Sequence, residues 1–119
     1  MTENKVKFTS ALKVIDTPYH ITLSFCDVVP RMGKFTTSRI STFVNVTDIV
    51  YWKDSDVTVA LLGNTRVIMK RKEYWESMGY TYDMEFIPHF TVGKGDVVKE
   101  NTHLIGNDYD AGDEYARLF

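Results

Sequence analysis

Two stretches of the chain share one pattern, Pro18-Tyr19-His20-Ile21-Thr22-Leu23 and Pro88-His89-Phe90-Thr91-Val92-Gly93. In each stretch a histidine is followed by an apolar residue, a threonine and a second apolar residue. Successive side chains of a β-strand point to opposite faces, so the histidine and the threonine share one face and the apolar residues occupy the other. The pattern therefore predicts two strands, each with an imidazole and a hydroxyl group on its polar face.

The sequence around these stretches predicts a sheet with several strands. Alternating or β-branched apolar residues predict strands over residues 5–15, 19–25, 49–53, 57–62, 82–92 and 97–105. Residues 36–46 have helical spacing but a β-favouring composition, so both alternatives stay open there. Pro30 and Gly33 predict a loop over residues 30–36.

One segment has the pattern of a helix. Asn64 or Thr65 can cap its start, the apolar residues follow a helical stripe to about Met78, and Gly79 is suited to end it. Strands that outnumber helices in this order predict an α+β fold with mostly antiparallel sheets and one or two helices. The length of 119 residues corresponds to a single domain over residues 1–119.

The composition excludes several classes of protein. The longest apolar runs, such as Val59-Ala60-Leu61-Leu62, are too short for a transmembrane helix, and the polar start does not resemble a secretory signal. Cys26 is the only cysteine, which excludes an internal disulfide framework. We therefore expect a cytoplasmic protein without a membrane partner.

The charge balance constrains the partners. The chain has 14 basic and 16 acidic side chains, and residues 81–119 hold 3 of the basic and 8 of the acidic ones. A protein that binds a long nucleic acid needs many lysines and arginines to contact the phosphates. Because the chain has no surplus of basic side chains, we do not expect a long nucleic acid as its partner. A small anionic ligand needs only a few suitable groups at one site.

The paired motifs suit phosphodiester chemistry. One imidazole can accept a proton from the attacking hydroxyl or water, and the other can donate a proton to the leaving oxygen, because the histidine pKa lies near neutrality. The threonine hydroxyls can bind non-bridging phosphate oxygens. The alternative interpretation is an interaction domain in which two surface strands carry histidine and threonine by chance.

His20-x-Thr22 and His89-x-Thr91 together resemble the paired motifs of the 2H phosphoesterase superfamily, which includes RNA 2′,3′-cyclic phosphodiesterases. The resemblance implies a compact bilobal fold, with two mostly antiparallel sheets around a central cleft. It also implies that His20 and His89 are the acid and base, that Thr22 and Thr91 bind phosphate, and that no metal or other cofactor is needed.

Among compact members, the chain resembles the bacteriophage anti-CBASS nucleases, which cleave cyclic di- and trinucleotide messengers. That resemblance implies a metal-independent phosphodiesterase that acts on a small cyclic nucleotide or short oligonucleotide, in the host cytoplasm if a phage encodes it. Two alternatives remain, an RNA 2′,3′-cyclic phosphodiesterase and a non-catalytic module that binds cyclic nucleotides.

Further residues are candidates for substrate contacts. The aromatic residues Tyr51, Trp52 and Tyr109 could stack on bases, and Lys94 follows the second motif in a glycine turn where it could neutralise a phosphate. The third histidine, His103, lacks the motif. It fits a surface position or, as an alternative, a zinc site with His20 and His89.

Overall fold

A computed structural model describes residues 5–29, 37 and 39–119 of the chain. It is an α+β structure with six strands, two short α-helices and one 3-10 turn. The elements are β1 (Val6–Val14), β2 (His20–Val28), β3 (Ser41–Trp52), β4 (Val57–Gly63), α1 (Arg66–Ser77), β5 (His89–Lys94), α2 (Val98–Asn101), the 3-10 turn η1 (Thr102–Leu104) and β6 (Asp108–Leu118).

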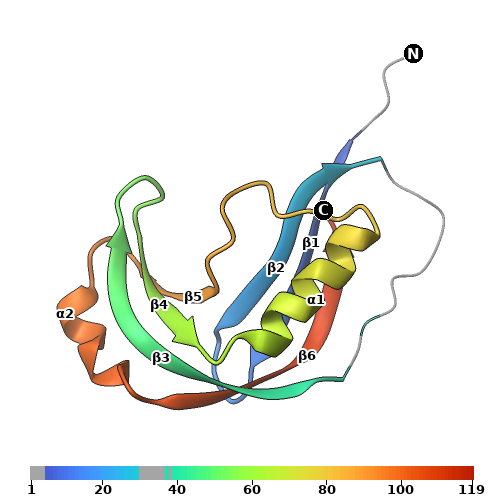
Figure 1. Cartoon of the computed structure of the whole chain (residues 1–119). Helices are drawn as coiled ribbons and strands as arrows, with labels where there is room; N and C mark the ends of the chain where they lie inside the picture. The colour runs from blue at the N-terminus through green and yellow to red at the C-terminus, as the bar shows by residue number, and fades with distance from the viewer. Residues whose placement is uncertain (1–4, 30–36, 38) are drawn as a thin grey trace.

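The six strands form one antiparallel sheet in the order β2-β1-β6-β3-β4-β5. The resemblance implied two sheets in two lobes, and this arrangement is not confirmed, because β6 pairs with β1 on one side and with β3 on the other. Figure 1 shows that the sheet is strongly curved, with the long strands β3 and β6 along the bottom of the curve. The bend brings β2 and β5, the two edges of the sheet, close to each other.

Local irregularities account for the bend. The β1–β2 and β1–β6 ladders each contain a register shift, and Asp113 of β6 has a positive φ of 48°. Bulges of this kind bend and twist a strand. Gly112 lies beside the shift, where a Cβ atom would come within 2.1 Å of the Ile40 carbonyl oxygen. Only glycine allows β6 to approach the start of β3 so closely.

Helix α1 matches the predicted helix and covers β1 and β2. Ile68 and Trp75 are fully buried, and the Trp75 ring lies 5.6 Å from the ring of Phe8 in β1. Gly79, with φ of +91°, ends the helix and donates its N–H to the carbonyl of Glu76. The helix is therefore held by aromatic packing on the sheet.

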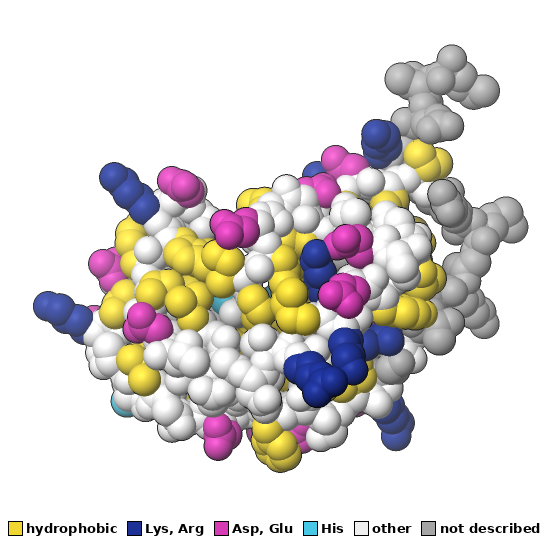
Figure 2. Space-filling view, in the orientation of Figure 1, with side chains coloured by type: hydrophobic (Ala, Val, Ile, Leu, Met, Phe, Trp, Pro, Cys, Tyr) yellow, Lys and Arg dark blue, Asp and Glu magenta, His cyan; other side chains and the backbone are white. Residues whose placement is uncertain are grey.

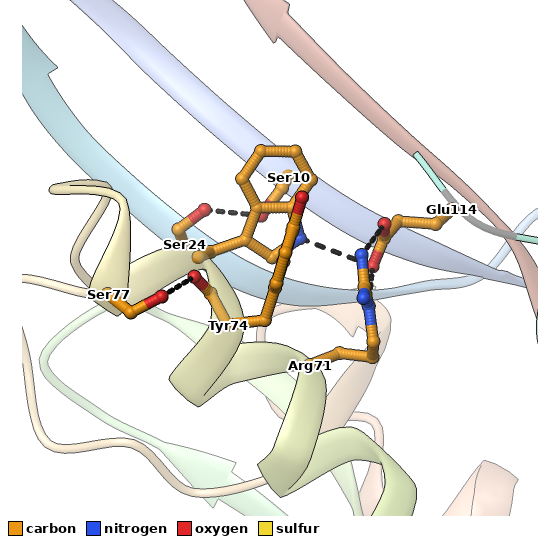
Figure 3. Close-up of polar contacts among 7 residues, drawn as sticks. Ser10, Ser24, Arg71, Tyr74, Ser77 and Glu114 are labelled. Carbon is orange, nitrogen blue, oxygen red and sulfur yellow. Dashed lines mark hydrogen bonds and ion pairs between the residues drawn. The ribbon is translucent and has the colours of Figure 1, made fainter. Parts of the chain in front are cut away.

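A buried polar network also joins α1 to the sheet (Figure 3). The Arg71 guanidinium forms a two-pronged ion pair with the Glu114 carboxylate of β6, with Nε to Oε2 at 2.8 Å. The indole N–H of Trp75 donates to the same carboxylate at 3.2 Å. The hydroxyls of Ser10 and Ser24 bond to each other between β1 and β2. A charged side chain is thus buried in β6 together with its counter-charge.

Three predicted elements differ from the structure. Residues 97–105 contain α2 and η1 rather than a strand, and the Thr58 hydroxyl, which accepts the N–H of Val97 at 2.9 Å, holds the start of this helical segment on β4. Residues 82–92 form a strand only from His89 onward. The acidic end of the chain, where the sequence predicts no strand, is itself the central strand β6.

The ambiguous stretch 36–46 is a strand from Ser41 onward, and its two uncertain residues, 36 and 38, lie outside the described residues. The predicted loop over residues 30–36 and the first four residues lie outside them as well. No helix in the described part of the chain has the length and apolar character needed to cross a membrane.

Candidate functional site

The two histidine motifs lie at the edges of the sheet that the bend brings together. His20 is the first residue of β2, and His89 is the first residue of β5. The neighbouring side chains hold the strands together, because the rings of Tyr19 and Phe90 stack with their centres 4.7 Å apart. His20 is close enough to His89 to lower its pKa by charge repulsion. The structure therefore places both imidazoles in one neighbourhood.

His89 is held in a defined orientation. Its Nδ1 lies 2.7 Å from the carbonyl oxygen of Ile87, and its ring meets the Trp52 ring edge-on with centres 4.5 Å apart. A carbonyl can only accept, so Nδ1 carries the hydrogen and the neutral ring has its lone pair on Nε2. Burial is the main cause that lowers the pKa of His89, and repulsion from His20 adds to it, while the bond to Ile87 acts in the opposite direction. His89 is therefore prepared to accept a proton at Nε2.

The threonines differ in their surroundings. Thr22 is half-buried and lines a cavity of about 440 Å³, together with Lys7, Phe25, Tyr82, Asp83 and Met84. Thr91 is exposed, two residues after His89 in β5, where alternation places it on the same face as the histidine. The two motifs thus lie on strands that contact each other, but Thr22 alone of the four motif residues lines a cavity.

A second cavity of about 540 Å³ lies on the His89 side. Its wall includes Trp52, which contacts the His89 ring, and Ile87, whose carbonyl binds that ring. The remaining lining residues are Tyr51, Lys53, Asp54, Ser55, Tyr82, Met84 and Glu85. Figure 2 shows histidine atoms recessed among apolar side chains on this face. Two of the residues, Tyr82 and Met84, line both cavities.

Of the predicted substrate contacts, the structure brings Tyr51 and Trp52 to the site. Lys94 is exposed at the far end of β5 and lines neither cavity. Tyr109 is also placed elsewhere, because its ring packs edge-on against Phe90 at 5.5 Å, and Phe90 points to the face opposite His89. The carbonyl of Ile87 and the side chains of Tyr82 and Met84 were missed by sequence reasoning.

The segment that carries these missed residues runs over residues 81–88 between α1 and β5. It is attached to β2, because the N–H of Phe25 donates to the carbonyl of Thr81 at 2.9 Å. It is attached to β4 as well, because the N–H of Leu62 donates to the carbonyl of Pro88 at 3.3 Å. The one sequence signal is an apolar residue between two acidic neighbours, Asp83-Met84-Glu85, and in the structure Met84 keeps 73% of its surface exposed. The segment spans the space between the two motif strands.

The three histidines do not come together as a ligand set. His103 is exposed in η1, which packs near β3, away from the motif strands. Within residues 5–29, 37 and 39–119, no group of three His, Cys, Asp or Glu side chains is placed to hold a metal ion. The geometry therefore does not support the zinc site that was considered as an alternative.

The chain matches no protein-family model and no curated protein. A functional assignment therefore depends on the two histidine motifs and on their placement in the fold.

Proposed function

We propose that the chain is a metal-independent phosphodiesterase of the 2H type, which acts on a small nucleotide through His20 and His89. One observation carries this proposal: the strands that begin with His20 and His89, from motifs 69 positions apart, lie against each other, and the neighbouring rings of Tyr19 and Phe90 stack with their centres 4.7 Å apart. The two halves of the curved sheet carry one motif each, and they would correspond to the two lobes of the superfamily. The substrate would bind between them.

The surroundings of the histidines support distinct roles. His89, neutral with a lone pair on Nε2, acts as the general base and takes a proton from the attacking water or ribose hydroxyl. The attacking oxygen forms a new bond to phosphorus while the bond from phosphorus to the leaving oxygen breaks. His20, exposed at the start of β2, acts as the general acid and donates its proton to that leaving oxygen. The hydroxyls of Thr22 and Thr91 donate to the non-bridging oxygens.

The preferred substrate is a cyclic oligonucleotide messenger, which would make the protein a phage counter-defence enzyme active in the host cytoplasm. This part of the proposal is supported by the resemblance of the motifs to compact anti-CBASS nucleases and by the lack of a basic surplus. The alternative substrate is an RNA end that carries a 2′,3′-cyclic phosphate. Both reactions use the same two histidines.

The proposal can be tested with a panel of cyclic di- and trinucleotides and 2′,3′-cyclic mononucleotides, with products separated by chromatography. The expected result is conversion of many substrate molecules per protein molecule. If one equivalent of nucleotide is depleted and then recovered intact after denaturation, the protein is a binding module rather than an enzyme. If no nucleotide is consumed or bound, the motifs do not form a nucleotide site.

A further inference from the structure

We infer that Trp52 is a positioning residue for His89, and that its ring holds the imidazole in the orientation that directs Nδ1 to the Ile87 carbonyl and leaves Nε2 free to accept a proton. Trp52 acts on the reaction through His89 rather than through the nucleotide. The catalytic part of this inference rests on the proposed function, whereas the orientation of the ring can be tested without any substrate.

The first argument is the fixed position of Trp52. It is the last residue of β3 and pairs with Val57 across the β3–β4 hairpin. The N–H of Asp56 closes the turn of that hairpin, because it donates to the carbonyl of Lys53 at 3.2 Å. The carbonyl of Asp56 in turn accepts the N–H of Gly95, directly after β5, at 2.8 Å. The backbone around Trp52 is therefore tied to the strand that carries His89.

The second argument is the contact between the two rings. Their centres are 4.5 Å apart and their planes are inclined at 62°. Aromatic pairs favour such an edge-on geometry, and this distance is at the short end of the range of about 4.5–7 Å in which they occur. Strand β4 lies between β3 and β5 and places Leu61 opposite His89 in the ladder. The contact therefore reaches across a strand, which a large ring such as indole can do.

The third argument is that the hydrogen bond to Ile87 is a weak restraint when it acts alone. It joins Nδ1 to a carbonyl only two residues earlier in the chain, at an exposed position where water can compete for both groups. On the side of β2, the titratable neighbour is His20, which repels the protonated ring and does not anchor it. A hydrogen bond and an aromatic pair contribute similar amounts to stability, so the Trp52 ring supplies about half of what holds the imidazole.

The test is long-range proton–nitrogen correlation NMR of the imidazole rings at about pH 8, without substrate. At this pH His89 is neutral, because its pKa is lowered from 6.5. The chain has three histidines, and the signals of His89 are the ones that disappear in His89→Gln. The wild type should show one tautomer, with the hydrogen on Nδ1. In Trp52→Ala the signals should move toward a mixture of tautomers, because the energy of an aromatic pair corresponds to about a 2- to 12-fold change in the ratio of ring orientations.

Two further variants and a control accompany this measurement. Trp52→Phe keeps a flat ring and should retain more of the Nδ1–H tautomer than Trp52→Leu, which keeps apolar bulk alone and also replaces Trp52→Ala if that variant does not fold. Phe43→Ala is the matched control on the same strand, because Phe43 is 62% exposed and lines neither cavity. It should leave the His89 signals unchanged. The inference is overturned if His89 has the wild-type tautomer in both Trp52→Ala and Trp52→Leu.

Kinetics separate this inference from the proposed function. Trp52→Ala should lower kcat by up to about 12-fold, in step with the loss of the Nδ1–H tautomer. If Trp52→Ala raises KM but leaves kcat and the tautomer unchanged, Trp52 is a substrate contact and only the positioning inference is wrong. If Trp52→Ala changes the tautomer but the wild type cleaves no nucleotide, Trp52 does orient His89 and the phosphodiesterase proposal is wrong.

Discussion

Replacement of Arg71 by methionine should destabilise the fold far more than the loss of one surface charge. The Glu114 side chain is 0% exposed and the Arg71 side chain 18%, so the substitution leaves a buried carboxylate without the guanidinium. Removing one partner of a buried ion pair costs about 3–5 kcal/mol. We expect Arg71→Met to lower the free energy of unfolding by about 3 kcal/mol, the lower end of this range. The Arg71 side chain is partly exposed to solvent, and methionine preserves the packing of its aliphatic part. A loss of about 3 kcal/mol is a large share of the roughly 5–15 kcal/mol typical of whole domains.

Urea unfolding, monitored by tryptophan fluorescence, measures this loss of stability, which should lower the unfolding midpoint by about 1–3 M. Lys72→Met is the matched control on the same helix, because its i,i+4 partner Glu76, at 2.6 Å, is half-exposed and keeps access to water. Such pairs contribute about 0.3–0.5 kcal/mol. The reasoning is refuted if Arg71→Met and Lys72→Met lower stability equally.

Three further predictions concern the site and the sheet. The pKa of His89 is lowered in the folded state, so the unfolded state binds more protons below about pH 6.5. The wild type should therefore lose stability as the pH falls from about 6.5 through the pKa of His89 in the folded state. His89→Gln should remove this part of the loss, which urea unfolding at each pH measures. Gly112→Ala should cost about 3 kcal/mol or more, because its Cβ would lie 2.1 Å from the Ile40 carbonyl oxygen; a melting temperature equal to that of the wild type would contradict the close approach. EDTA should leave turnover unchanged, whereas loss of activity that zinc restores would favour a metal mechanism.

The sequence predicts those elements of the fold in which local pattern and tertiary position agree. Strand β2 alternates strictly at its start, and α1 has both an apolar stripe and a glycine stop, so both were predicted within a few residues. Strand β6 could not be predicted, because aspartates interrupt its apolar pattern. Asp110 accepts the Ser41 hydroxyl at 3.0 Å, and Glu114 is paired with Arg71. These partners are distant in sequence and give no local signal.

For the site, the sequence predicts the four motif residues but not the space around them. The approach of β2 to β5 depends on the bent sheet, and hence on ladder irregularities and on Gly112. The 81–88 segment is positioned by backbone hydrogen bonds to Phe25 and Leu62, which do not depend on the type of side chain. The sequence therefore gives no indication of Tyr82 and Met84 as lining residues, whereas it indicates Trp52 as an aromatic residue that could stack on a base.

The most direct test of the account is the single-turnover rate of His20→Ala and His89→Ala on the nucleotide that the wild type cleaves fastest. One positioned acid or base contributes about 10²–10⁴ in rate, so each variant should slow by about that factor while nucleotide binding persists. The double variant should lose much less than the product of the two factors, because the two residues act together. The wild-type rate should be bell-shaped in pH, which reports one acid and one base. If both single variants cleave the nucleotide at the wild-type rate, the two histidines do not catalyse the reaction.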